Sequence, residues 1–174
     1  MPDLPKLARF SRGAAAEHIA ALVREGELRV VTTPRSDRAR ASRRAKIVAL
    51  PEVRSLRSYL VCLHEIGHVL GPNPPKRLDQ EVAAWHWALV QSRWEPTPAC
   101  WAMIGRALGS YVARAVARRN MAVPSEAHPI WPLVPVDRRE VIEIEDTSTD
   151  PRRAAWLVWC LVRERVRDPS WSRG

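Results

Sequence analysis

Residues 63–71 read Leu63-His-Glu-Ile-Gly-His-Val-Leu-Gly71 and contain the pattern H-E-x-x-H. The surrounding segment, residues 54–70, has apolar residues at helical spacing and no internal proline, which predicts one amphipathic helix that ends at Gly71. His64 and His68 are four residues apart, so they lie about one turn apart on the same face of that helix. Both imidazoles can therefore reach one metal ion, and the pattern indicates zinc.

Glu65 directly follows the first histidine, and its role does not require contact with the metal. In this pattern such a carboxylate acts as the general base on a metal-activated water and then passes the proton to the leaving amine. A five-residue pattern also arises by chance, and two helical histidines can simply pack against a core. The amphipathic context of the segment favours the metal site.

A catalytic zinc site takes three protein ligands and keeps a fourth position open for water. One arrangement extends the pattern to H-E-x-x-H-x-x-G-x-x-H, and this chain follows it through Gly71 but has Pro74 in place of the last histidine. In a second arrangement, a glutamate on the next helix completes the set. The segment 78–85 supplies Glu81 for this role, and the small side chain of Ala84 would let the two helices approach closely.

Asp79 and His86 are the other candidates for the third ligand. His86 follows Glu81 by five residues, which places it about 140° away around a helix, so these two side chains should not face the same ion. Glu81 also has a simpler interpretation, as a solvated carboxylate in the first turn of a helix, where the helix dipole favours acidic residues. We favour Glu81 as the ligand.

With these residues in place, the sequence resembles a minimal gluzincin, the metallopeptidase group that combines H-E-x-x-H with a later glutamate. More narrowly, it is similar to the small bacterial, phage and mobile-element zincins related to the ImmA/IrrE and SprT-like groups. The resemblance covers mainly residues 28–95 and depends on residues 63–68 and 81–88. The interval between the second histidine and the glutamate is very short in this chain.

The resemblance implies that zinc is held by His64, His68 and Glu81, and that Glu65 is the catalytic carboxylate. It also implies that the strand before the motif helix, residues 47–50, forms an edge along the cleft that pairs with an extended substrate.

Length and composition are those of a globular protein. The sequence has 174 residues, 46% of them hydrophobic, which suffices for the core of one domain. The formal net charge of +9 and the pI of about 10.6 fit a protein that contacts nucleic acid or other acidic partners. An arginine-rich coding bias explains the same values equally well.

Three widely separated cysteines, Cys62, Cys100 and Cys160, stand in apolar helical contexts. We interpret them as reduced core residues rather than as disulfides or zinc ligands. The sequence shows neither a secretory signal nor a long uncharged apolar stretch. We therefore expect a cytoplasmic protein that does not enter a membrane.

Local patterns predict a mostly helical chain with a few strands. The expected helices besides the motif helix are 14–25, 78–93, 99–119 and 151–167, and the expected strands are 28–33, 46–50 and 141–145. The basic stretch 35–44 is expected to be a solvated loop rather than a nucleic-acid contact.

The expected fold class is therefore α+β, mostly helical and zincin-like. A small sheet of two or three strands precedes the H-E-x-x-H helix, and the C-terminal half is helical. Residues 1–135 would form the metallopeptidase domain. Residues 136–174 would add a strand and an amphipathic helix that either packs on the same domain or presents a face to a partner.

His128, within the proline-rich stretch 124–135, is a candidate catalytic residue that closes over the site and stabilises an oxyanion. Tyr111 is a weaker candidate for such a role. His18 is expected at the surface. Three tryptophans are expected to pack in the core or at its rim: Trp85, Trp87 and Trp94.

The function that the sequence favours is an intracellular zinc metallopeptidase that hydrolyses a protein substrate, such as a regulator or a DNA-associated protein. One alternative is a basic module that binds nucleic acid or a partner and has a structural or vestigial metal site. Another is a helical adaptor that uses its tryptophan-bearing terminal helix. Glu65 separates the first function from the second, because a structural metal site does not need a general base.

Overall fold

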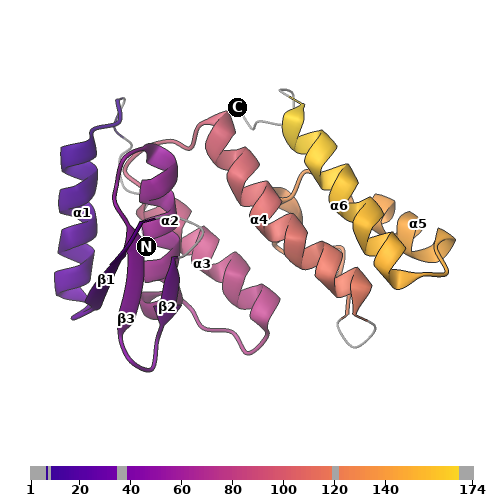
Figure 1. The fold of residues 1–174 in the computed structure, drawn as a ribbon, viewed down its shortest axis with the longest axis horizontal. Helices are drawn as coiled ribbons and strands as arrows, with labels where there is room; N and C mark the ends of the chain where they lie inside the picture. The colour runs from indigo at the N-terminus through magenta and orange to yellow at the C-terminus, as the bar shows by residue number, and fades with distance from the viewer. Residues whose placement is uncertain (1–6, 8, 35–38, 119–121, 169–174) are drawn as a thin grey trace. The chain divides into compact units, whose positions relative to one another are not determined.

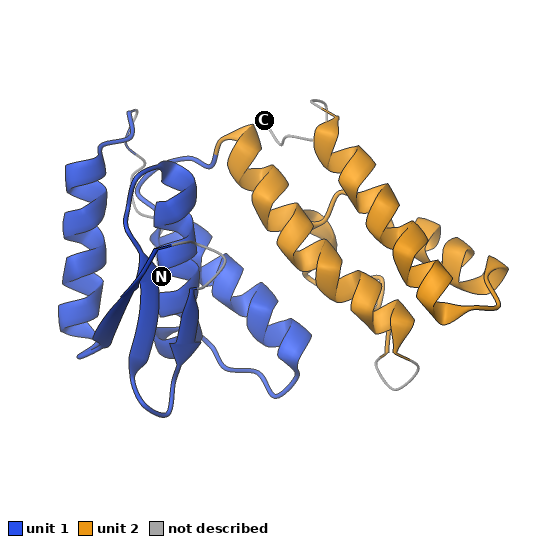
Figure 2. Ribbon diagram, in the orientation of Figure 1, with its two compact units in different colours: residues 1–96 blue, residues 97–174 orange. Residues whose placement is uncertain are grey.

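A computed structural model describes residues 7, 9–34, 39–118 and 122–168. The chain divides into two compact units, residues 1–96 and residues 97–174 (Figure 2). This division lies between Pro96 and Thr97, in a proline-bounded break, and not after residue 135 as expected from the sequence. The boundary falls earlier because the C-terminal helices pack on the helix that follows this break.

In the part of the chain that the structure describes, the first unit combines a small sheet with three helices (Figure 1). Its elements are α1 (Arg12–Glu25), β1 (Arg29–Thr33), β2 (Arg40–Ser42), β3 (Ile47–Pro51), α2 (Leu56–Leu70) and α3 (Arg77–Gln91). The expected α+β class, with a small sheet before the motif helix and a helical remainder, is confirmed. The core of this unit lies between the sheet and α2, where Val48, Leu50 and Leu63 are buried.

β3 is the central strand, in the order β1-β3-β2. β1 pairs with it in parallel, with Val30 opposite Val48, and β2 pairs with it antiparallel, with Ala41 opposite the same residue. The prediction that residues 47–50 form a free substrate-binding edge is therefore wrong, because both sides of this strand are hydrogen-bonded. Within the described residues, the outer edges of the sheet belong to β1 and β2.

The basic stretch between β1 and β3 is partly structured, whereas a solvated loop was expected. Its residues 40–42 form β2, and residues 35–38 lie outside the described residues. Arg43 donates from Nε to the carbonyl of His68 at 3.0 Å and from Nη2 to the carbonyl of Gly71 at 2.6 Å. The last carbonyls of an α-helix have no partner within the helix, so Arg43 stabilises the end of α2.

α2 begins with a capping box in which Ser55 and Ser58 each accept the other's backbone N–H, at 3.3 and 2.9 Å. Further along, its Gly67 faces α3 closely: a Cβ at this glycine would lie 3.0 Å from the carbonyl oxygen of Ala84. The close approach of the two helices that the small side chain of Ala84 predicts is confirmed. This approach brings the motif helix within reach of side chains on α3.

His18 on α1 is buried, with 6% of its surface exposed, so its expected surface position is wrong. Its Nδ1 lies 2.7 Å from the hydroxyl of Tyr59, which also accepts the backbone N–H of Arg93 at 3.3 Å. The hydroxyl can therefore donate its own proton to the imidazole. Burial, together with the charge of Arg93, lowers the pKa of His18 to about 4, so the ring is neutral at pH 7.

The tryptophans of the first unit pack as expected. Trp85 and Trp94 are buried, and the indole of Trp87 lies against Gly67 and Gly71. Trp94 packs edge-on against Tyr59 with ring centroids 5.2 Å apart. This aromatic contact forms part of the core next to α1.

In the residues described, the second unit contains helices and turns but no strand. Its elements are α4 (Pro98–Ala117), the 3₁₀ turn η2 (Trp131–Leu133), α5 (Arg138–Thr147) and α6 (Pro151–Arg167). α6 packs along α4, and a Cβ at Gly109 would lie only 2.6 Å from a methyl carbon of Val162. The terminal helix thus packs within this unit.

Residues 141–145 belong to α5, so the predicted strand there is wrong. Asp137 and Glu140 form a capping box that starts a helix at Arg138, and Val141 is the one buried residue of the helix. The apparent alternation of apolar and acidic residues was too short to distinguish a strand from one apolar stripe of a helix. Local capping therefore decides the conformation.

Candidate metal centre

Three side chains from two helices converge in the first unit: His64 and His68 from α2, and Glu81 from α3. The two Nε2 atoms lie 3.1 Å apart. Oε2 of Glu81 lies 3.4 Å from Nε2 of His64 and 3.6 Å from Nε2 of His68. The group can hold a metal ion, with one donor atom from each residue. Asp79 and His86, the rival ligands, are not members of this cluster.

The spacing of the three donor atoms fits a tetrahedral metal. Donors bonded to zinc at about 2.0–2.1 Å lie about 3.3–3.4 Å from one another, and the observed separations of 3.1, 3.4 and 3.6 Å bracket that value. Two imidazole nitrogens and one carboxylate oxygen also form a donor set that suits zinc. The residues present therefore fit the metal that the sequence indicates.

The protonation states also suit metal binding, because ligands must be neutral imidazole and ionised carboxylate. Burial lowers the pKa of His64, which is 6% exposed, and so favours the neutral ring. Burial alone would raise the pKa of Glu81, but hydrogen bonds from the two histidines, and the positive charge that these rings carry when protonated, outweigh it and lower that pKa well below the usual range.

Trp85 holds the first ligand in place. Its indole stacks on the ring of His64 with centroids 4.2 Å apart and planes inclined by 25°. The ring's other nitrogen, Nδ1, is buried and has no hydrogen-bond partner. The orientation of this imidazole is therefore supported by packing against the indole and by the contacts of Nε2 with His68 and Glu81, and not by a hydrogen bond at Nδ1.

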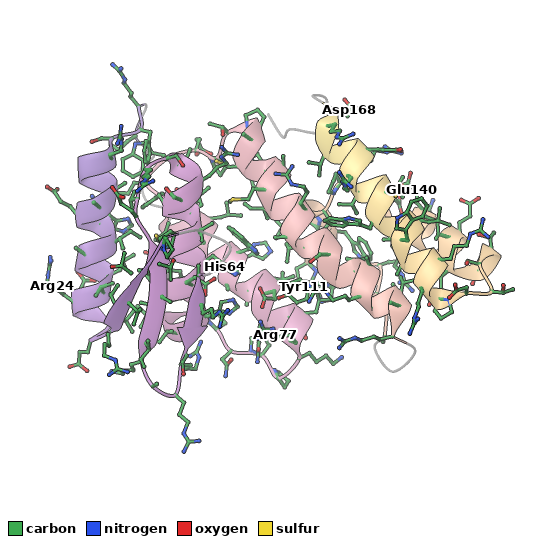
Figure 3. The ribbon with its side chains drawn as sticks, viewed as in Figure 1. Arg24, His64, Arg77, Tyr111, Glu140 and Asp168 are labelled. Carbon is green, nitrogen blue, oxygen red and sulfur yellow. The ribbon has the colours of Figure 1, made fainter. Side chains whose placement is uncertain are left out.

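Arg77 contacts the third ligand from the surface of the protein. Its Nη2 lies 2.8 Å from Oε1 of Glu81, one helical turn away on α3. The two groups are close enough for an ion pair, but their alignment does not meet the geometry of a hydrogen bond, so the buried Oε1 has no hydrogen-bond donor. Figure 3 labels Arg77 near the start of α3 and His64 on α2.

Glu65 is half-buried beside the cluster, and it makes no hydrogen bond or ion pair with any described residue. Burial raises the pKa of its carboxyl to about 7; the positive charge of His68 opposes this shift, and the negative charge of Glu81 adds to it. Because the Glu65 carboxylate has no hydrogen-bond or ion-pair partner among the described residues, it makes no polar contact there that stabilises the fold.

His128 and Tyr111 belong to the second unit. The backbone N–H of Ile130 donates to Nδ1 of His128 at 3.1 Å, which fixes the ring locally. The guanidinium carbon of Arg114 lies 4.6 Å from the ring centroid of Tyr111. The roles of these two side chains at the site therefore stay predictions.

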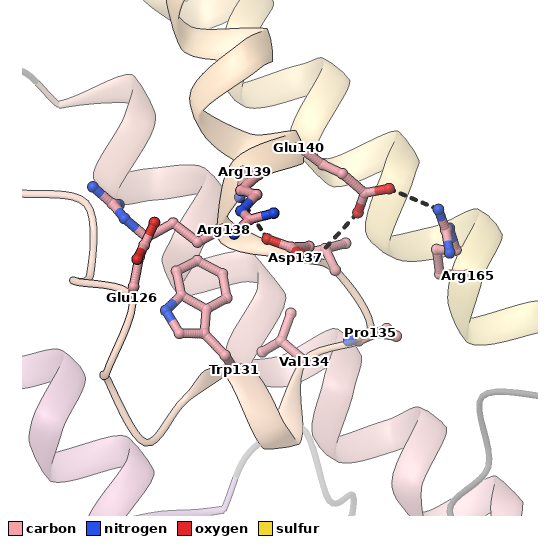
Figure 4. Close-up of a pocket in the computed structure, with 10 residues that line it drawn as sticks. Glu126, Trp131, Val134, Pro135, Asp137, Arg138, Arg139, Glu140 and Arg165 are labelled. Carbon is pink, nitrogen blue, oxygen red and sulfur yellow. Dashed lines mark hydrogen bonds and ion pairs between the residues drawn. The ribbon is translucent and has the colours of Figure 1, made fainter.

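The second unit has a pocket of its own, of about 810 Å³, which the indole of Trp131 helps to line (Figure 4). Several of the charged side chains that line it form ion pairs or hydrogen bonds within the unit. Arg165 pairs with Glu140 at 2.7 Å, and Arg138 donates to the carbonyl of Pro124 at 2.6 Å. None of the metal ligands lines this pocket.

Arg77 and Trp85 were not predicted to support the site. Both are four residues from Glu81 on α3, one before it and one after it, so helical spacing alone places them on the glutamate's face. This signal was available in the sequence, although it does not tell which of the two residues contacts the carboxylate and which contacts a histidine.

No protein-family model, curated protein or solved structure matches this chain. Among the helices that the structure describes, none combines the length and the apolarity that a membrane crossing requires.

Proposed function

We propose that the first unit is a zinc-dependent peptidase of the gluzincin type. The observation that carries the proposal is the convergence of His64, His68 and Glu81 at tetrahedral spacing, next in the chain to Glu65, whose carboxylate has no hydrogen-bond or ion-pair partner among the described residues. A purely structural site would need the three ligands but would gain nothing from Glu65.

Each residue has a definite task in this proposal. Zinc, when bound, supplies Lewis acidity to a water molecule and to the carbonyl of the scissile peptide bond. His64, His68 and Glu81 hold the ion and leave one side open to substrate. Glu65 takes a proton from the attacking water and returns it to the nitrogen of the leaving amine, so the peptide bond is hydrolysed without net proton change.

The proposed substrate is an intracellular protein. Three free thiols, two of them buried, support a reducing compartment such as the cytoplasm. The resemblance to phage and mobile-element zincins supports a regulator or a DNA-associated protein as the target.

The test compares wild-type protein with Glu65→Gln, both loaded with one equivalent of zinc, on a dye-labelled unfolded protein as a general peptidase substrate. We expect Glu65→Gln to keep its zinc and to lose turnover by about 10²- to 10⁴-fold, because the general base is gone. His64→Ala should lose both zinc and turnover. Full turnover in Glu65→Gln would show that the proposed mechanism is wrong.

A further inference from the structure

α6 has an outward face that differs from the face packed on α4. Three small or β-branched residues, Ala154, Val158 and Val162, are its buried residues. On the opposite side, five arginine and tryptophan residues follow one another at intervals of four, three, four and four, which is one continuous helical stripe. This basic-aromatic stripe consists of Arg152, Trp156, Trp159, Arg163 and Arg167.

The aromatic part of the stripe is exposed to an unusual degree. Trp156 has 62% of its surface exposed, the highest value among the large hydrophobic side chains described, and Trp159 is half-buried. Exposed tryptophan contributes nothing to a core, and large aromatic side chains at a surface are typical of binding sites.

The basic part of the stripe is not neutralised by its surroundings. Arg152, Arg163 and Arg167 are exposed, and none forms an ion pair with a described residue. Arg165 differs, because it lies on the inner side of α6 and pairs with Glu140 at 2.7 Å. The stripe itself contains no acidic residue. It therefore presents three unneutralised guanidinium groups around an exposed indole.

We propose that the basic-aromatic stripe binds single-stranded nucleic acid, with Trp156 stacking on an unpaired base and the flanking arginines contacting phosphates. Bases stack on aromatic side chains regardless of sequence, and a positive groove or stripe follows the backbone. The stripe extends over 16 residues, from Arg152 to Arg167, or about 22 Å along the helix, which spans several nucleotides. The proposal is independent of the metal site.

Two other anionic partners fit the stripe less well. An amphipathic helix that lies on a membrane inserts a wide apolar face, but the apolar face of α6 is already packed on α4. A duplex offers phosphates but keeps its bases stacked, which leaves the indole of Trp156 without a partner. Nothing in the stripe accepts a hydrogen bond from a 2′-hydroxyl, so DNA and RNA strands should bind equally.

The experiment measures binding of the full chain to fluorescein-labelled (dT)₁₅ by anisotropy between 50 and 200 mM salt. Trp156→Ala should weaken binding by about 5- to 100-fold, and Trp156→Phe should retain most of the affinity, because a phenyl ring still stacks. The double variant Arg152→Gln/Arg163→Gln should reduce the slope of log K against log salt by about 1.4, since two phosphate contacts are lost.

The matched control is Arg24→Gln/Arg57→Gln, which removes the same two charges from α1 and α2 and should leave the slope unchanged. All four exchanged positions are exposed, and circular dichroism of each variant confirms the fold. Labelled (U)₁₅ should bind as (dT)₁₅ does. The proposal is overturned by lack of (dT)₁₅ binding at 50 mM salt, by unchanged affinity in Trp156→Ala, or by preference for a duplex, for polyglutamate or for vesicles of anionic lipid.

Discussion

Nη2 of Arg77 lies 2.8 Å from Oε1 of Glu81, while the other carboxylate oxygen lies 3.4 Å from Nε2 of His64. An exposed arginine thus faces one oxygen of a buried carboxylate, and the second oxygen is turned toward the histidines. Groups that contact a ligand from outside fix its orientation and so contribute to metal affinity. Arg77 is in this sense a positioning residue for the proposed zinc site.

Replacing Arg77 by methionine should weaken zinc binding by about 10- to 100-fold, because the carboxylate loses the group that orients it. Loss of a positive charge near a cation acts in the opposite direction, so weaker binding specifically indicates an orienting role. Competition with a chromophoric chelator measures the affinity. Lys76→Met removes the same charge one residue away and should leave the affinity unchanged; tighter binding in Arg77→Met would contradict the interpretation.

Gly67→Ala should separate α2 from α3. The new Cβ would lie 3.0 Å from the carbonyl oxygen of Ala84 and 3.1 Å from the indole of Trp87, and neither the backbone nor the packed ring can yield easily. We expect the free energy of unfolding of the metal-free protein to fall by about 1–3 kcal/mol, measured by urea denaturation.

The control for this substitution is Gly13→Ala on α1, where nothing lies within 4 Å of the added Cβ. Alanine favours a helix over glycine by up to about 1 kcal/mol, so the control should be neutral or stabilising. Equal effects of the two substitutions would show that the contact between α2 and α3 is not tight.

Stability should fall in acid because of His18. Its pKa is lowered from 6.5 to about 4 in the folded protein, so the unfolded chain takes up a proton at a higher pH than the folded one. The contribution of the neutral His18 ring to the free energy of unfolding is complete above pH 6.5. It is lost as the pH falls toward 4, and the total loss is about 3 kcal/mol.

Urea denaturation of wild type and His18→Gln at pH 7.5, 6, 5 and 4.5 tests this prediction. Their difference in free energy of unfolding should narrow as the pH falls, since glutamine does not titrate. A constant difference over this range would show that the buried imidazole is not the group responsible. Because wild type and His18→Gln are compared at the same pH, the contributions of the other titrating residues cancel in the difference.

The local features of the sequence were enough to predict which three side chains converge as potential metal ligands. Helical spacing places His64 and His68 on the same face of α2. The turn between α2 and α3 is short, so the first turns of α3 lie close to that face, and Glu81 is in this part of α3. The order of the strands was not predictable in the same way, because pairing of residues 40–42 with β3 is a long-range interaction that no local pattern records. For this reason, the central position of β3 was missed.

The remaining errors have two origins: a long-range contact in one case, and a local pattern that fits two kinds of element in the other. The burial of His18 depends on the hydroxyl of Tyr59, 41 residues away, and nothing near His18 in the sequence indicates that partner. The helix at residues 138–147 has a local capping box, but the alternation of apolar and acidic residues at 141–145 predicts a strand at the same place. The stacking of Trp85 on His64 follows from how α2 and α3 cross, which spacing along one helix does not determine.

The central claim is that His64, His68 and Glu81 hold one zinc ion. The most direct measurement is the metal content of wild type, Glu81→Ala and Asp79→Ala by elemental analysis after dialysis against a weak chelator. We predict one zinc per chain in wild type and in Asp79→Ala, and its loss in Glu81→Ala. Absence of zinc from the wild type, or full retention of zinc in Glu81→Ala, would contradict the assignment.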